Sequence, residues 1–208
     1  MEPLFDLTGR TVAVGGELPT AAVIDALLRM NADAKHWRTP ITVYLGVGGE
    51  HRRGLTAIEA VQMCSLLPSL RSAVHTVGLG LLHGFEPLVL AAGHPGHRHL
   101  LPHALISIGG LEVEGVPQLP NGTVGLAHHH QGLSLREQAK AMITTQIRQL
   151  SKDFRLPRDL WTNPRVITAA QAVQVGLADA LVPSINPQRI PKFEKPHEKE
   201  TALAPTQP

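Results

Sequence analysis

Short runs rich in β-branched residues alternate with amphipathic runs through most of this 208-residue chain. In the amphipathic run after Pro19, the apolar residues Val23, Ala26, Leu27 and Met30 recur at helical spacing. Such alternation is typical of βα units around a mainly parallel sheet. The sequence therefore predicts an α/β domain, with strands at 11–14, 41–45, 73–77, 104–108 and 177–182 and helices from Pro19, over 55–67, through 88–92 and over 168–175.

Composition narrows the class of protein. Hydrophobic residues make up 43% of the chain and charged residues 17%, which is enough apolar material for a folded core. A net charge of +2 and an aromatic content of 3% disfavour nucleic-acid binding, and no stretch is apolar enough to predict a membrane span. Cys64 is the only cysteine and the amino terminus is unlike a signal peptide, so we expect a reducing compartment, the cytoplasm.

The second half of the chain contains a long predicted helix and a change of composition. A capping box at Ser134–Glu137 starts the helix, which runs to Phe154 with Leu135, Met142, Ile147 and Leu150 among the residues of its apolar face. After Pro183 the sequence is dominated by Pro, Lys, Glu, Gln and Thr. We therefore expect one domain over 1–184 and a disordered tail over 185–208.

Glycine-rich turns follow three of the predicted strands, at 46–49, 78–84 and 108–110. Parallel sheets place ligand groups at the carboxyl ends of their strands, so these turns mark the edge where a site is expected. Backbone N–H groups in such turns can stabilise an oxyanion, but glycine serves tight packing equally often. The glycines alone do not identify an activity.

Read together, several segments resemble the ClpP family, the self-compartmentalising serine peptidase of the Clp system. The resemblance covers about residues 9–182 and includes Gly48-Gly49, the run from Thr76 to Gly93, Arg98–Pro102 and the segment Ala169–Asp179, in which Gln171 replaces the family's Glu. It implies a ClpP/crotonase-like fold, with a protruding handle helix in a handle region at about 111–157. Gly48 and Gly49 match the oxyanion-side glycines of the family, although the turn itself also requires glycine.

The catalytic triad implied by this resemblance is absent. In active members the nucleophilic serine lies nine residues before the glycine that ends its helix, which from Gly93 gives Gly84. The base histidine lies eleven residues after the arginine, which from Arg98 gives Gly109, and the orienting aspartate falls at Pro164. A serine attacks only when a base takes its proton and a third group orients that base. The resemblance is thus to ClpR-type subunits, which lack the triad.

Other residues near these positions offer weaker alternatives. His83, Ser107 and Glu86 could form a relocated triad, and Asn163 adjoins Pro164. Adjacent residues point in different directions, which argues against that substitution. His51-Arg52-Arg53 could steer unfolded peptide in a chamber or only be solvated.

Two histidine clusters raise the question of a metal. They comprise His94, His97, His99 and His103, and the triple His128-His129-His130. Imidazoles at this spacing can bind metals, but no cysteine or carboxylate completes a recognised motif. We expect surface histidines, no metal and no cofactor.

The leading hypothesis is a catalytically inactive subunit in heptameric rings. The resemblance implies homo- or hetero-oligomers with ClpP-like subunits, a Clp-family AAA+ ATPase and unfolded polypeptide in a shared chamber. Leu135, Met142, Ile147 and Leu150 would then pack across two rings. The alternatives are a homo-oligomeric scaffold outside proteolysis, or an enzyme with a relocated serine peptidase or crotonase-like site.

Overall fold

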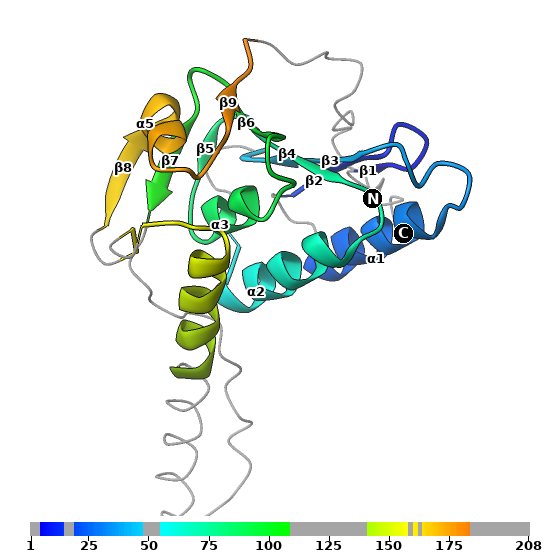
Figure 1. The fold of residues 1–208 in the computed structure, drawn as a ribbon, viewed down its shortest axis with the longest axis horizontal. Helices are drawn as coiled ribbons and strands as arrows, with labels where there is room; N and C mark the ends of the chain where they lie inside the picture. Colours follow the sequence, from blue (N-terminus) through cyan, green and yellow to red (C-terminus); the bar gives the residue numbers. More distant parts are fainter. Residues whose placement is uncertain are drawn as a thin grey trace, which may run out of the picture.

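The computed structural model describes residues 5–14, 19–47, 55–108, 141–157, 160–161 and 164–183. These residues form an α/β fold with a mainly parallel main sheet (Figure 1). Its strand order is β1-β2-β3-β4-β6-β9, and every neighbouring pair is parallel except β1 and β2. The strands are β1 (Phe5–Asp6), β2 (Thr11–Ala13), β3 (Ile41–Leu45), β4 (Val74–Gly78), β6 (Arg98–Leu100) and β9 (Ala180–Leu181).

A smaller sheet stands beside the main one, in the order β5-β7-β8. Strand β5 (Leu81–Leu82) runs parallel to β7 (Leu105–Ile108), whereas β8 (Arg165–Thr168) runs antiparallel to it. The predicted strand at 104–108 is therefore present. It does not belong to the main sheet, although the alternation of strands and helices in the sequence suggested that it would. Strand β6 takes that place, because the chain returns to the main sheet directly after α3.

Helices cover one face of the main sheet (Figure 1). The predicted apolar positions of α1 (Thr20–Ala32), namely Val23, Ala26, Leu27 and Met30, are its buried residues. They pack in the same core as residues of α2 (Ala57–Leu66) and α3 (Glu86–Ala91). A 3₁₀ turn, η1 (Leu67–Ser69), follows α2. The helical spacing read from the sequence is confirmed for α1.

The last helix, α5 (Ala169–Gln174), has a capping box at its amino end and a glycine after its carboxyl end. Thr168 accepts a hydrogen bond from the Gln171 backbone N–H at 3.3 Å, and the Gln171 side chain accepts one from the Thr168 backbone N–H at 2.9 Å. Gly176, with φ +81°, follows the helix. Glutamine at the family's glutamate position therefore preserves the reciprocal cap, which explains why this departure from the motif leaves the helix intact.

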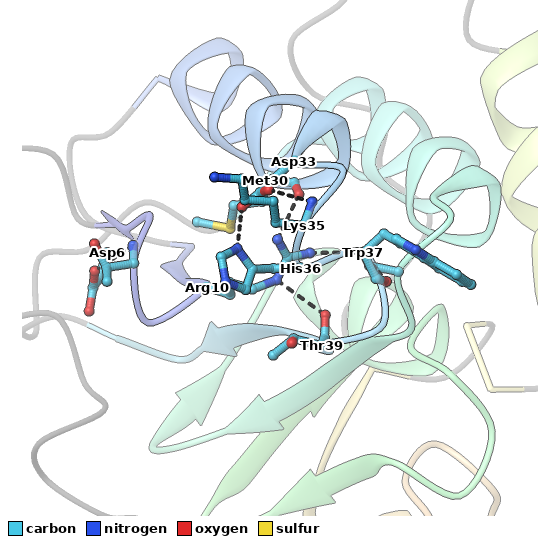
Figure 2. Close-up of polar contacts among 10 residues, drawn as sticks. Asp6, Arg10, Met30, Asp33, Lys35, His36, Trp37 and Thr39 are labelled. Atoms are coloured by element: carbon cyan, nitrogen blue, oxygen red, sulfur yellow. Dashed lines mark hydrogen bonds and ion pairs between the residues drawn. The ribbon is translucent and has the colours of Figure 1, made fainter.

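Arg10 is a buried charged residue that joins four segments (Figure 2). Its guanidinium donates to the carbonyls of Met30 at 2.7 Å and Thr39 at 3.1 Å, and to Ser72 Oγ at 2.8 Å. Burial lowers the pKa of Arg10, an effect that nearby Asp33 partly offsets. These bonds fasten the end of α1 to the residues preceding β3 and β4.

Arg98 and Asp179 form an ion pair between β6 and the residues after α5, with side chains 14% and 21% exposed. Arg98 Nε donates to Asp179 Oδ2 at 2.9 Å, as does the Arg98 backbone N–H at the same distance. Arg98 Nη1 also donates to the Gly176 carbonyl at 3.1 Å. Burial by itself would raise the pKa of Asp179, but the hydrogen bonds from Arg98 hold it below its usual value.

Parts of the predicted domain plan fall outside the described residues. These are the boundary at 184, the tail over 185–208, the Ser134–Glu137 capping box and most of the handle region. Residues 141–153 are described and helical, as expected for the handle helix. Within the described ranges, no helix is long and apolar enough to cross a bilayer.

We predict that Asp179→Asn lowers the free energy of unfolding by about 2–3 kcal/mol, because it leaves the half-buried Arg98 without its counter-ion. Denaturant titration measures this. The control is Asp25→Asn, which removes an exposed ion pair with Arg29 and should cost at most about 0.5 kcal/mol. The difference between wild type and Asp179→Asn should shrink as pH falls below about 4, since the ionised carboxylate is the stabilised form. Equal losses in the two variants would contradict this role.

We also predict that Arg10→Met lowers the free energy of unfolding by about 2–4 kcal/mol, since the Met30 and Thr39 carbonyls lose their charged donor. Arg10 has φ +52°, and any L-residue placed there keeps that backbone cost. Both variants, Arg10→Met and Arg10→Lys, keep this backbone cost, so thermal unfolding measures the stability that the hydrogen bonds contribute. We expect Arg10→Lys to lose less stability than Arg10→Met. A loss below about 1 kcal/mol in Arg10→Met would show that the network is dispensable.

Candidate functional site

Two of the three predicted triad positions are described, and both lie at the end of the small sheet where β7 finishes, on opposite sides of β7. Gly84 comes two residues after Leu82, the register partner of Ile106 in β7. Pro164 comes directly before Arg165, the register partner of Ile108, where β7 ends. Gly109, the next residue after Ile108, lies outside the described residues. The pairing of β5, β7 and β8 thus brings together segments that are 80 residues apart in sequence.

The backbone at Gly84 has the shape of a tight strand-to-helix turn without a nucleophile. Gly84 has φ +62° and is exposed, just before α3 begins. The following amide, Phe85 N–H, donates to the Leu55 carbonyl at 3.3 Å. An oxyanion site needs N–H groups aimed at the reacting atom. At this turn the Phe85 amide is already bonded within the protein.

Glu86 has a structural role in the same turn. It is fully buried, and its carboxylate accepts a hydrogen bond from the His83 backbone N–H at 3.2 Å. Its own backbone N–H donates to the His83 carbonyl at 3.3 Å. These two bonds close the turn that leads into α3.

The relocated triad finds no support among the described contacts. Ser107 and His83 are both half-buried, Ser107 on β7 opposite Val166 and His83 in the turn before α3. No hydrogen bond between described residues joins a serine to a histidine and a carboxylate in this region. Asn163 lies outside the described residues.

The glycine turn after β3 serves close packing where it is described. A Cβ at Gly46, which has φ +74°, would lie 3.0 Å from Leu82 Cδ1 and 3.1 Å from the Gly80 nitrogen. Gly46 therefore lets the ends of β3 and β4 approach β5 closely. The oxyanion-side pair, Gly48 and Gly49, and the basic His51-Arg52-Arg53 lie outside the described residues.

The first histidine cluster gains a member from a distant strand. His75 of β4 stacks on His97, with ring centroids 4.1 Å apart, and His97 also lies near His94 and His99. Burial, followed by the charges of His97, His99 and His94, lowers the pKa of His75 to about 4. No group of three or more potential ligands among the described residues could hold a metal ion. The triple histidine at 128–130 lies outside them.

The residues predicted to join two rings have different environments in the helical stretch 141–153. Met142 is 66% exposed, as a contact residue requires. Ile147 is fully buried in the core of its own chain, and Leu150 packs partly against that core. The expectation that Ile147 packs across two rings is therefore wrong, because one helix face cannot fill the domain core and a partner's surface together. Leu135 lies outside the described residues.

Sequence reasoning missed two features of this region. His75 was not associated with His97, because the two are brought together only by the pairing of β4 with β6. Arg98 and Asp179 were used only as motif positions, and their ion pair depends on the docking of β9 beside β6. The sequence did offer one indication of this pair. Arg98 and Asp179 have opposite charges, and each lies in a motif segment that contains few other charged residues.

Comparison with known proteins identifies the family that this chain resembles. The family model described as Clp protease matches residues 7–184. A curated relative, ATP-dependent Clp protease proteolytic subunit 4 of Rhodococcus jostii, is 27% identical over 181 residues, covering 85% of this chain and 86% of the relative. An ATP-dependent Clp protease proteolytic subunit-like protein of Synechococcus elongatus is 29% identical over 200 residues, covering 92% and 82%.

Solved structures show the same fold at low identity. A solved enzyme structure superposes with a TM-score of 0.62 at 16% identity, covering 85% of this chain and 97% of that chain. A peptidase from Plasmodium falciparum superposes with a TM-score of 0.57 at 15% identity, with the same coverages. With the family model spanning nearly the whole domain, the chain belongs to the Clp protease family.

Proposed function

We propose that this chain is a catalytically inactive subunit of a Clp protease assembly, with a structural or regulatory role in a ring. The observation that carries the proposal is that Gly84 and Pro164, at two of the predicted triad positions, lie at the same end of the small sheet. Glycine has no nucleophile, and loss of a serine nucleophile alone costs on the order of 10⁶ in turnover. What the chain retains is the scaffold, and a scaffold can still support assembly.

The exposed apolar side chains of the small sheet support an assembly role. Leu81 and Leu105 are register partners and are 50% and 44% exposed, and Val166 on β8 is 62% exposed. Met142 on the handle helix is 66% exposed. Apolar side chains grouped on one sheet face, rather than scattered singly, are characteristic of a contact surface. We assign the small-sheet face and Met142 to contacts with neighbouring subunits.

The resemblance supplies the composition of the proposed assembly. The chain would join ClpP-like subunits in heptameric rings, in the cytoplasm, with an AAA+ ATPase delivering unfolded polypeptide. Purification from the native source, followed by mass spectrometry of attached proteins, tests this. A co-purifying subunit with a complete triad supports the proposal, whereas a pure homo-oligomer supports the scaffold alternative.

We predict that the chain does not cleave fluorogenic peptides and is not labelled by a fluorophosphonate probe. Gly84→Ser should remain equally inactive, because a hydroxyl without a base and an orienting carboxylate keeps its proton. Peptide hydrolysis and probe labelling measure this, with a triad-bearing Clp peptidase as positive control. Labelling of any serine in the wild-type chain would refute catalytic inactivity.

We also predict that Val166→Lys and Met142→Lys each shift the chain from its oligomer toward smaller species in sedimentation velocity, since a buried unpaired ammonium is costly. Leu28→Lys is the matched control: Leu28 is 47% exposed, but it belongs to α1, which lies away from the small sheet (Figure 1). Its sedimentation profile should be unchanged. An identical profile for all three variants would exclude these surfaces from the interface.

A further inference from the structure

A cleft of about 800 Å³ lies at the opposite end of β4 from the vacated triad positions. It is formed where η1, the residues leading into β4, the end of α3 and the end of the helix 141–153 meet. Its apolar lining includes Leu67, Leu70, Ala91 and Phe154. The cleft is thus separate from the candidate site, and its volume and walls suit a small amphipathic ligand.

Positively charged side chains outnumber negatively charged ones in the lining of this cleft. Arg71, Arg98, Arg155 and Asp153 all line it. Arg98 is already paired with Asp179, and Asp153 accepts a hydrogen bond from Gln149 Nε2 at 2.9 Å. Among the described residues, neither Arg71 nor Arg155 has a carboxylate within ion-pair distance. Two guanidinium groups therefore remain available to an anion.

Arg155 occupies a backbone position that favours glycine. Its N–H donates to the Lys152 carbonyl at 2.9 Å and the Leu156 N–H donates to the Ser151 carbonyl at 2.8 Å, which is the paired pattern of a helix C-terminal motif. At this position Arg155 has φ +58°. Glycine adopts that conformation freely, whereas any other residue there is strained. The arginine side chain thus occupies the cleft at a cost in stability.

Arg71 is held in place by an aromatic ring. Its guanidinium carbon lies 5.5 Å from the centroid of the Trp37 ring, and that of Arg38 lies 4.9 Å from the same centroid. Such cation–π contacts restrict the side chain before any ligand arrives. Arg38 does not line the cleft, so it provides a matched comparison.

We propose that this cleft binds a ligand with an apolar body and a terminal carboxylate. The carboxylate is held by Arg71 and Arg155, which present planar donors suited to it, and the apolar body lies against Leu70 and Phe154. Two sources share this chemistry, a fatty acid anion and the free carboxyl end of an apolar peptide. The inference does not depend on whether the chain is catalytically silent.

Calorimetric titration of the full chain tests the proposal with four probes: octanoate, octanamide, the peptide Ac-Leu-Leu-Leu and its carboxyl-terminal amide. Saturable binding of octanoate or of the free-acid peptide, at least about tenfold tighter than its amide, supports the site. The tighter of the two acids identifies the source. No saturable binding of either acid, or equal binding of acid and amide, overturns the proposal.

Arg155→Gly separates binding from structure. Glycine relieves the φ +58° backbone, so the variant should unfold at an equal or higher temperature while binding the acid at least about tenfold more weakly. Arg71→Gln should weaken binding similarly, and Arg38→Gln should leave it unchanged. Retained affinity in both Arg155→Gly and Arg71→Gln, or an equal loss in Arg38→Gln, would overturn the assignment.

Discussion

The ion pair between Arg98 and Asp179 joins β6 to the residues that lead from α5 into β9, the neighbouring strand of the main sheet. Arg98 lies in β6 of the main sheet, and Asp179 follows α5, whose amino end continues from β8 of the small sheet. A paired, hydrogen-bonded charge at low exposure is costly to break, because one partner's loss leaves the other desolvated. Together with the bond from Arg98 to the Gly176 carbonyl, the pair therefore holds the carboxyl end of α5 against β6.

The proposed loss of the triad is compatible with persistence of the fold, because the predicted triad positions and the core are different residues. Stability comes from buried apolar side chains such as Leu88, Leu100 and Ile106, and from buried hydrogen bonds such as those of Arg10. The triad positions contribute little to either: Gly84 is exposed in a turn, and Pro164 is exposed before β8. A catalytic constellation can thus disappear while the scaffold keeps its shape.

Sequence patterns predicted the elements whose signals are local. The spacing in α1 identified its four buried residues, and the short helix before Gly176 begins and ends within a residue of the prediction. Strand β6 went unrecognised because Arg98-His99-Leu100 is short and polar, and it becomes a strand only by pairing with β4 and β9. Ile147 could not be assigned correctly, since periodicity shows an apolar face but not which surface covers it.

The sequence by itself determined the family and the α/β class, because these follow from motif segments and local spacing, and the same spacing predicts Gly84, Gly109 and Pro164 at the triad positions. Tertiary structure alone decided that Gly84 and Pro164 lie at the same end of the small sheet, that His75 stacks on His97, and that Arg71 and Arg155 line one cleft. Each of these depends on contacts between segments distant in the chain. Local propensity carries no information about such contacts, which arise when the whole core is buried at once.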